Sequence, residues 1–367
     1  MDVLIAGGGT GGHLFPGIAL AQELRRRDAD GRVLFVGTKL GIETTAVPRA
    51  GFNLELLPVS GLRRVGLFGF LLGMLRLPLA MLRALQLVRR FGPDVAVSVG
   101  GYAAGPAVLA SRLLGVPCVV MEQNAVPGFT NKVLGRMARR IFAALPTQGF
   151  PASKVRILGN PVREDLLAVR ESPYQPAQPL QLLIFGGSQG ARALNEAMMA
   201  AAPSLATQGP ELRIVHQTGI ADQERVERAY RDAGLGDVQV VAFIDDMASA
   251  YRQASLVLCR AGATSIAELT VCGRPAILVP YPSAVDDHQT ANALTLSDAG
   301  AAIHLPQSEL TAERLVALLG KLTGDPALLR AMAAASLAAG KPEAVGAIAD
   351  ALEQEVKQDG AQEVDRV

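Results

Sequence analysis

Short apolar runs alternate along the chain with longer segments of helical periodicity, and glycine-rich turns join many of them. Residues 3–6 (VLIA) predict a buried strand, and residues 7–13 predict a glycine turn. Residues 15–27 predict the first helix, with Pro16 in its first turn, where a missing N–H costs nothing. A second strand is predicted at 32–36. This order of elements is typical of a parallel sheet covered by helices.

The same pattern restarts in the second half of the chain. Residues 180–185 predict a strand, residues 186–190 a glycine turn and residues 191–202 a helix. A chain of 367 residues also exceeds what one hydrophobic core usually holds. The predicted fold class is therefore α/β, with two Rossmann-like domains whose parallel sheets face each other across a cleft.

The domain boundaries follow from where the pattern is interrupted. Residues 171–181 contain three prolines and no periodicity, which is typical of a linker. We expect an N-terminal domain at 1–159, a linker region at 160–181 and a C-terminal domain at 182–342. Residues 343–356 are apolar at helical spacing, and we expect this helix to cross back onto the first domain.

The stretch from Cys259 to Asn292 is the most informative part of the second half. A short apolar strand precedes a turn of small residues at 260–263, and a helical pattern then runs from 264 to 271. Backbone N–H groups at a helix N-terminus attract a diphosphate. Ser265 and Glu268 also fit a capping box, which needs no ligand. The lack of bulky side chains in the turn favours a ligand site.

Charge and composition narrow the classes of protein. Residues 1–158 hold 19 Lys and Arg against 8 Asp and Glu, whereas residues 159–367 hold 16 against 26. The first half therefore suits an anionic partner, although ordinary variation between domains is the alternative. The three cysteines lie in or beside apolar runs and predict buried thiols of a reducing compartment. With four scattered histidines, no metal site is expected, and the strand directly after Met1 argues against a signal peptide.

A basic, apolar segment lies between Leu56 and Pro93. It contains six arginines and no acid, and its longest uncharged run, 65–75, has 11 residues. A spanning helix needs about 20 residues, so this run does not cross a bilayer. The segment suits a helix that lies on an anionic membrane surface. A core helix with a solvated basic face is the alternative.

A dinucleotide-binding domain must also be considered. Gly7, Gly9 and Gly12 match the G-x-G-x-x-G motif. That motif requires an acid at the end of the second strand to bind the ribose, but the chain reads Val36-Gly37-Thr38 there. An NAD-dependent oxidoreductase is therefore disfavoured.

Eight motifs stand in order along the chain: GGTGGH, GGY, EQN, GNPVR, GGSQGAR, FIDDM, RAGATSIAE and DDHQTAN. This series resembles the MurG family of bacterial glycosyltransferases, which move N-acetylglucosamine from UDP onto lipid I to make lipid II. The resemblance covers residues 3 to about 352. It implies a GT-B fold, an inverting displacement without a required metal or cofactor, and peripheral attachment to the cytoplasmic face of the inner membrane.

The resemblance also implies roles for individual residues. Ser188 and the helix start at Ala263, Thr264, Ser265, Ile266 and Ala267 would hold the UDP phosphates, while Glu268 would accept from the ribose hydroxyls. Ile244 would hold the uracil edge through its backbone, and Arg163 would lie near the nucleotide. Gln289 and Asn292 look like ligands of the sugar hydroxyls. Thr10, Gly11, Gly12 and Asn124 match positions that contact the transferred sugar or the acceptor phosphates.

The chain departs from the family pattern at Met121, Ala261, Asp286 and Asp287. Met121 replaces a frequent histidine before the EQN motif, and Ala261 replaces a serine. The two acids replace a more basic version of their segment. None of these positions is a proposed base or ribose ligand. We therefore expect the departures to affect the affinity for substrates and not the assignment to the family.

Two residues are candidates for the catalytic base, His13 and Glu122. His13 ends the first glycine turn, where the helix dipole disfavours an imidazolium and keeps the ring able to accept a proton. Glu122 follows the strand predicted at 117–121, at the edge of the sheet where ligands bind. We predict His13 as the base, with Glu122 as an orienting residue or alternative base. A histidine that only packs at a helix start, and a glutamate that only ties down backbone, are the plainer alternatives.

The expected partners are UDP-N-acetylglucosamine, lipid I and an anionic membrane surface, with proteins of cell-wall synthesis as further candidates. Nothing in the sequence indicates nucleic acid. Two other functions remain open at this point: a related diacylglycerol glycosyltransferase, and a scaffold that binds a UDP-sugar without catalysis. The presence of both His13 and Glu268 argues against the scaffold.

Overall fold

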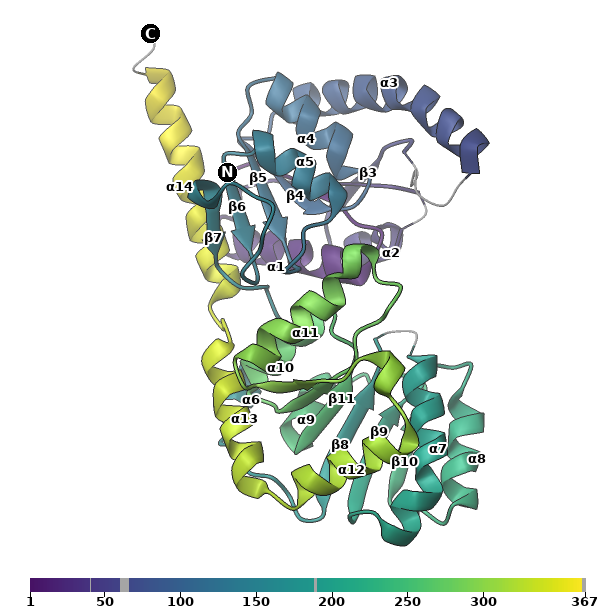
Figure 1. Cartoon of the computed structure of the whole chain (residues 1–367). Helices are drawn as coiled ribbons and strands as arrows, with labels where there is room; N and C mark the ends of the chain where they lie inside the picture. The colour runs from purple at the N-terminus through teal and green to yellow at the C-terminus, as the bar shows by residue number, and fades with distance from the viewer. Residues whose placement is uncertain (40, 60–65, 188–189, 365–367) are drawn as a thin grey trace. The chain divides into compact units, whose positions relative to one another are not determined.

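The structure is a computed structural model, and it describes residues 1–39, 41–59, 66–187 and 190–364. The chain divides into two compact units (Figure 1). The first contains Met1–Pro161 and Glu343–Val367, and the second contains Val162–Pro342. Each unit is built around its own parallel sheet, as the repeated sequence pattern predicts.

The first unit has a sheet of seven strands in the order β3-β2-β1-β4-β5-β6-β7. Its strands are β1 (Val3–Gly7), β2 (Val33–Gly37), β3 (Asn53–Leu56), β4 (Val95–Gly100), β5 (Cys118–Glu122), β6 (Arg140–Ala143) and β7 (Val155–Ile157). Its helices are α1 (Gly11–Arg27), α2 (Glu43–Arg49), α3 (Gly66–Phe91), α4 (Ala104–Leu113), α5 (Phe129–Met137) and α14 (Ala344–Val364), with a short 3-10 turn at Ala152–Lys154.

Helix α1 begins four residues earlier than its sequence pattern suggests. It starts at Gly11, so Pro16 lies in the helix interior and its predicted place in the first turn is wrong. Thr10 has the extended backbone of an N-cap residue, and its carbonyl accepts from Leu14 N–H. Two glycines in the first turn hide the helical signal, because glycine is a poor helix former and adds no apolar face.

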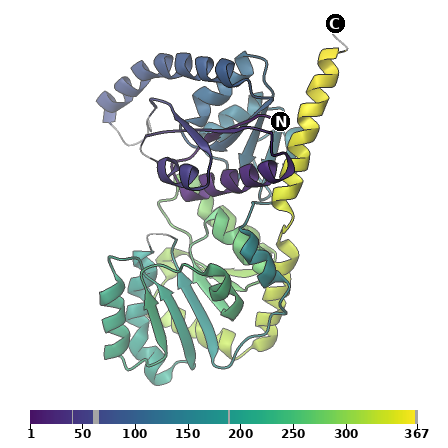
Figure 2. The same ribbon diagram turned by 180° about the vertical axis from the view of Figure 1, so that it is seen from behind.

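The central strands of the first unit are apolar on both faces because helices cover each of them. On one face, α3, α4 and α5 pack over a cluster that includes Leu4, Val36 and Val120. On the other, α1 packs over Ile5, Val97 and Val119 (Figure 1). Helix α14 contacts α1 on this second face, as the reverse view also shows (Figure 2). Ile348 and Leu352 of α14 are fully buried there.

The second unit has a sheet of six strands in the order β10-β9-β8-β11-β12-β13. Its strands are β8 (Leu180–Phe185), β9 (Leu212–Gln217), β10 (Val238–Val241), β11 (Leu256–Cys259), β12 (Ala276–Leu278) and β13 (Ala302–His304). Its helices are α6 (Glu164–Arg170), α7 (Arg192–Gln208), α8 (Gln223–Asp232), α9 (Met247–Gln253), α10 (Ala263–Cys272), α11 (His288–Asp298), α12 (Ala312–Thr323) and α13 (Pro326–Ala339), with 3-10 turns at Val285–Asp287 and Gln307–Glu309.

Helix α3 occupies the basic, apolar segment of the first half. Ala80, Ala84 and Val88 recur every four residues and are buried on the side where α3 contacts α4, whereas Leu79 and Leu82 are exposed. Arg63, Arg64 and the side chain of Arg76 lie outside the described residues. Within the described ranges, no helix combines the length and the apolar character needed to cross a membrane.

Candidate active site

The first glycine turn lies at the carboxyl end of β1 and contacts the turn after β4. Gly8 N–H donates to the Gly100 carbonyl oxygen over 3.1 Å. A Cβ atom on Gly7 would overlap that carbonyl group, and one on Gly101 would overlap the backbone of Gly8. Two backbone segments approach this closely only where side chains are missing. The turns therefore present bare backbone at the edge of the sheet where ligands bind in such folds.

His13 is the third residue of α1 and stands beside these turns. Its Nδ1 atom lies 3.1 Å from Oγ1 of Thr10, the N-cap residue. Its ring packs against Gly100, where an added Cβ would lie 3.1 Å from the His13 Cδ2 atom. Gly11 and Gly12 form the first turn of the helix before it, where N–H groups have no acceptor within the helix. The ring therefore lies at the positive end of the helix dipole.

Glu122 ends β5 with its carboxylate buried and surrounded by donors. Only 2% of the residue is exposed. Oε1 accepts from the Asn124 N–H and side-chain amide over 3.0 and 3.3 Å, and Oε2 accepts from Gly128 N–H over 3.3 Å and from Asn131 Nδ2 over 3.0 Å. Burial raises the pKa of Glu122, and these hydrogen bonds offset part of that rise. The carboxylate thus holds the loop after β5 in one conformation.

Asn131 of α5 joins this carboxylate to the neighbouring strands. Its amide nitrogen also donates to the Met121 carbonyl over 2.9 Å, and its amide oxygen accepts from Ser98 Oγ over 2.7 Å. Both Asn131 Nδ2 and the His13 ring lie within about 3.5 Å of the position that a Gly100 Cβ would occupy. The structure therefore gathers His13, Asn131 and Glu122 around the ends of β1, β4 and β5. The sequence analysis missed Asn131, whose only signal is a buried polar position on an otherwise apolar helix face.

In the second unit, the glycine turn after β8 leads into α7. Gly190 lies directly against the Thr218 carbonyl group, which leaves no space for a side chain at that position. Ser188, the predicted phosphate ligand of this turn, lies outside the described residues.

The turn after β11 leads directly into α10, and Gly262 is the N-cap residue of that helix. Ser265 is therefore the third helical residue and cannot be the N-cap, so the capping box proposed for Ser265 and Glu268 is not formed. Gly262 has no side chain that could cap the helix, and it forms no side-chain capping hydrogen bond. The N–H groups of Ala263, Thr264 and Ser265 belong to its first turn, where they have no acceptor within the helix. Thr264 Oγ1 is buried and has no hydrogen-bond partner among the described residues. This helix start suits an anion.

Glu268 lies in the second turn of α10, after Ile266 and Ala267. Its Oε2 accepts from the Tyr251 hydroxyl over 3.0 Å, and its Oε1 lies 3.8 Å from an Arg163 guanidinium nitrogen. Burial raises the pKa of Glu268, whereas Arg163 and Tyr251 act in the opposite direction. The structure thus brings Arg163 to Glu268, although 105 positions separate them in the sequence. Tyr251 is a second residue that the sequence analysis missed, because nothing local connects α9 with α10.

Of the remaining predicted ligands, Asn292 contacts the turn before this helix. Asn292 of α11 is fully buried and donates from Nδ2 to the Ala261 carbonyl over 3.0 Å. Gln289 Oε1 accepts from Tyr281 N–H over 3.0 Å. Asp286 and Asp287, just before α11, both adopt left-handed backbone conformations. Ile244 lies in the loop between β10 and α9, whose N-cap is Asp246.

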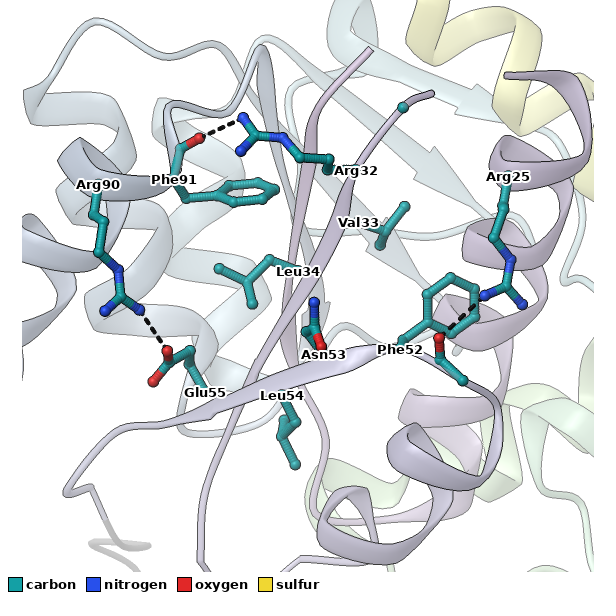
Figure 3. A pocket seen from close by; sticks show the side chains of 12 residues that line it. Arg25, Arg32, Val33, Leu34, Phe52, Asn53, Leu54, Glu55, Arg90 and Phe91 are labelled. Atoms are coloured by element: carbon teal, nitrogen blue, oxygen red, sulfur yellow. Dashed lines mark hydrogen bonds and ion pairs between the residues drawn. The ribbon is translucent and has the colours of Figure 1, made fainter. Parts of the chain in front are cut away.

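A separate hollow of about 600 Å³ lies at the amino ends of β2 and β3, away from the glycine turns (Figure 3). Arg25, Arg32 and Arg90 line it, but each already has protein partners. Arg25 donates to backbone carbonyls and stacks on Phe52, while Arg32 pairs with Asp2 and Arg90 with Glu55. We do not place a substrate in this hollow. Among the described residues, no three His, Cys, Asp or Glu side chains gather closely enough to hold a metal ion.

Both units match models of one enzyme family. Residues 3–143 match the glycosyltransferase family 28 N-terminal domain, and residues 181–348 match its C-terminal domain. The chain is 49% identical over 352 residues to the UDP-N-acetylglucosamine–N-acetylmuramyl-(pentapeptide) pyrophosphoryl-undecaprenol N-acetylglucosamine transferase of Myxococcus xanthus, which covers 95% of this chain and 92% of that protein. It is 47% identical over 361 residues to the transferase of the same name from Nitratidesulfovibrio vulgaris, which covers 97% and 98%.

Solved structures agree with these sequence matches. The crystal structure of Acinetobacter baumannii MurG has a TM-score of 0.81 and 35% identity, and it covers 96% of this chain and 99% of that one. The calicheamicin glycosyltransferase CalG4 has a TM-score of 0.69 at 18% identity and shows the fold alone, which is GT-B. The chain therefore belongs to glycosyltransferase family 28 and, within it, to the MurG family of N-acetylglucosaminyltransferases.

Proposed function

We propose that the protein transfers N-acetylglucosamine from UDP-N-acetylglucosamine to the MurNAc 4-hydroxyl of lipid I, which yields lipid II for peptidoglycan. The family to which the chain belongs supports this activity over a diacylglycerol glycosyltransferase and over a scaffold without catalysis. The observation that carries the proposal is the start of α10. It combines first-turn backbone N–H groups, at a helix whose N-cap residue makes no side-chain capping hydrogen bond, with the partly buried carboxylate of Glu268 in the next turn, whose side chain is 13% exposed.

In the proposal, the second unit binds the donor. The diphosphate lies on the N–H groups of Ala263, Thr264 and Ser265, with Ser188 as a further ligand. As the bond to the sugar breaks, negative charge develops on this diphosphate, and the helix N-terminus stabilises it. Glu268 accepts from the ribose hydroxyls.

The remaining donor contacts complete this part of the proposal. Ile244 holds the uracil edge through its backbone, and Arg163 lies near the nucleotide. Gln289 and Asn292 bind the sugar hydroxyls, and their hydrogen bonds to the backbone at Tyr281 and Ala261 hold them beside the α10 turn.

The first unit supplies the acceptor site and the base in this proposal. Thr10, Gly11, Gly12 and Asn124 contact the transferred sugar or the acceptor phosphates. The 4-hydroxyl oxygen attacks the anomeric carbon, UDP leaves from the opposite face, and His13 takes the hydroxyl proton at Nε2 while Nδ1 donates to Thr10. Glu122 orients the loop that carries Asn124, because the described hydrogen bonds to its carboxylate come from that loop and from Asn131.

A membrane-facing surface on the first unit completes the proposal. Exposed apolar side chains lie on three adjacent helices: Leu79 and Leu82 on α3, Leu113 on α4, and Phe129, Val133 and Met137 on α5. The three α5 residues are spaced by four and therefore share one helix face. Exposed cations, Arg83, Arg112, Lys132 and Arg136, lie among them. We call these residues the α3–α5 face and propose that it binds anionic lipid on the cytoplasmic side of the membrane, where lipid I is reached.

One assay tests the activity. The protein is incubated with radiolabelled UDP-N-acetylglucosamine and a short-chain lipid I analogue, and we expect UDP release together with a labelled disaccharide lipid. Release of UDP without a disaccharide product, or transfer to diacylglycerol instead, would overturn the proposal.

The role of His13 is tested by replacing it with alanine. A positioned proton acceptor contributes about 10²- to 10⁴-fold, so His13→Ala should lower kcat by that factor. UDP affinity should stay near its native value, because the nucleotide lies in the other unit. The acidic limb of the kcat–pH profile should vanish in His13→Ala. Loss of that limb in Glu122→Gln, with its retention in His13→Ala, would exchange the two roles.

A further inference from the structure

Glu43 is a buried acid of the first unit that the proposed function leaves without a role. It is the first residue of α2, and only 1% of it is exposed. Its Oε2 accepts from Gly9 N–H over 2.8 Å. Its Oε1 accepts from the N–H and the hydroxyl of Thr38, each over 2.9 Å. The carboxylate therefore ties the glycine turn after β1 to the start of the loop after β2.

The surrounding backbone is shaped for this side chain. A Cβ atom on Gly8, Gly37 or Gly41 would overlap the Glu43 side chain. Gly8 after β1, Gly37 at the end of β2 and Gly41 in the loop after β2 thus leave the space that the side chain of Glu43 fills. Burial alone acts to raise the pKa of Glu43, but the hydrogen bonds from Gly9 and Thr38 outweigh it and the pKa is lowered. The buried group is consequently ionised at neutral pH.

The position of this charge differs from the dinucleotide-binding pattern that the glycines resemble. In that pattern, the N–H groups of the first glycine turn bind a pyrophosphate, and an acid after the second strand binds a ribose. Here an acid does follow β2, but it turns inward and its carboxylate takes the Gly9 N–H itself. The Glu43 carboxylate thus accepts from Gly9 N–H, which is one of the donors that a bound phosphate would use.

The turn that Glu43 fixes leads directly to the candidate base. Gly8 and Gly9 have φ values of 139° and 86°, which L side chains rarely adopt. Thr10 follows as the N-cap of α1, and its hydroxyl contacts His13 Nδ1. We propose that Glu43 is a positioning residue for the transfer reaction, whose carboxylate serves as the resident anion of the first glycine turn and so holds Thr10 and His13 in place. This inference rests on the proposed function, because His13 acts as a base only within it.

The test replaces Glu43 with glutamine, which keeps the size of the side chain. An amide has one acceptor oxygen, so either Gly9 or Thr38 faces an NH₂ group instead of an acceptor. Displacement of a reacting group by about 1 Å costs about 10²-fold, so we expect kcat of Glu43→Gln to fall about 10- to 100-fold. The KM for UDP-N-acetylglucosamine should change by less than about twofold, because the donor is bound by the second unit.

A second readout does not depend on turnover. The chain has only four histidines, so the ring signals can be resolved by NMR, and the His13 signal is assigned by its loss in His13→Ala. In Glu43→Gln, we expect this signal to shift while those of His216, His288 and His304 stay in place. Transfer that fails in the native protein would overturn the proposed function, whereas an unmoved His13 signal in Glu43→Gln would overturn the role of Glu43.

Two control variants separate positioning from general damage. Thr38→Val removes one of the three hydrogen bonds to the carboxylate but keeps the one from Gly9, so it should lower kcat and shift the His13 signal less than Glu43→Gln does. Glu55→Gln removes an acid elsewhere in the unit and should keep native kcat and the native His13 signal. A Glu43→Gln protein with native kcat, or one that loses melting temperature and UDP affinity together with kcat, would contradict the proposal.

If Glu43→Gln does not fold, a further variant tests whether the first glycine turn positions His13. A Cβ atom on Gly9 meets nothing within 4 Å, but its φ value disfavours any L side chain. Gly9→Ala therefore disturbs the turn without touching the carboxylate. It should lower kcat and shift the His13 signal, and native behaviour in both would show that the turn does not position His13.

Discussion

At the scale of single residues, Glu268 is the proposed ribose ligand, and its protein contacts are known. It is held by Tyr251 and lies near Arg163, and no capping role remains for it. A carboxylate that accepts hydroxyl hydrogen bonds contributes about 1.5–3 kcal/mol, so Glu268→Ala should weaken UDP binding about 10- to 100-fold. Titration calorimetry measures this affinity.

The control for this prediction is Glu196→Ala, which removes an acid that pairs with Arg192 on the surface of α7. It should leave UDP affinity unchanged. If Glu268→Ala binds UDP with native affinity but unfolds at a lower temperature, the carboxylate only stabilises the fold through Tyr251 and Arg163.

His216 makes the stability of the second unit sensitive to pH. It is fully buried, its ring contacts Tyr230 and Asn195 through its two nitrogens, and burial lowers its pKa to about 3. In the unfolded chain this histidine takes up a proton near pH 6.5, whereas in the folded protein it stays neutral down to its lower pKa. The contribution of His216 to the unfolding free energy is therefore fully present above pH 6.5 and is lost as the pH falls toward the folded pKa. Between pH 7 and pH 5, His216 should account for a loss of about 2 kcal/mol in unfolding free energy.

Urea unfolding of the native protein and of His216→Gln at both pH values measures this term. The native protein should lose more stability than the variant over the same window. An equal loss in both proteins would mean that other groups carry the pH dependence.

The residues that the sequence predicted and those it missed differ in a physical way. His13 and Ala263–Glu268 carry local signals, since each lies in a glycine or small-residue turn next to a strand. Glu43, Asn131 and Tyr251 act through contacts between elements that are distant in sequence, and a single sequence contains no record of such contacts. The capping box at Ser265 was a plausible local pattern, and it is wrong because the N-cap residue is Gly262, three residues earlier.

At the scale of elements, strands and glycine turns were predicted more accurately than helix starts. A buried parallel strand is a continuous apolar run and ends at a turn, so both of its limits are visible. The start of α1 was hidden by Gly11 and Gly12, and Pro16 gave a misleading signal. For α3, one face is buried, as the core alternative expects, whereas Leu79 and Leu82 are exposed. Binding of this helix to a membrane stays a prediction.

The α3–α5 face gives a prediction about membrane binding. Each cation near an anionic surface contributes about 1 kcal/mol, so reversing Arg83 and Lys132 to glutamate should weaken binding to anionic vesicles at least about 30-fold. Binding of the native protein should also fall as salt rises. Sedimentation with vesicles measures both effects.

The matched control reverses Arg228, a surface cation on α8 of the second unit. That variant should sediment like the native protein, and all three proteins should bind UDP equally. Equal sedimentation with neutral vesicles, without any effect of salt, would mean that the face does not recognise anionic lipid.

At the scale of the whole molecule, the repeated strand, turn and helix pattern predicts two parallel-sheet units, and this is confirmed by both sheets. Composition could not show how α14 is held in the first unit. Arg27 binds Asp350 and Glu353, and Arg140 lies 2.9 Å from the buried Glu355 carboxylate. These pairs join residues about 200 to 330 positions apart, and only the folded chain brings them together.

Helix α14 should stabilise the first unit and should not affect the stability of the second unit. Leu352 is fully buried in its core, and truncation of a buried leucine to alanine costs about 2–5 kcal/mol. Leu352→Ala should therefore speed hydrogen exchange in β1 and β4 while exchange in the second unit and UDP affinity stay unchanged. Glu353→Ala, which removes a surface ion pair, is the control and should cost less than about 1 kcal/mol. Faster exchange in both units would contradict this division.

The return of the chain to its first unit has a consequence for protein synthesis. On the ribosome, residues 1–161 emerge first, but the helix that covers α1 emerges only after the whole second unit has been made. The nascent first unit must therefore wait with the apolar face around Leu20 and Leu24 uncovered, where chaperones can bind. A chain that ends between the second unit and Leu352 therefore has a first unit that lacks part of its core and exposes apolar surface.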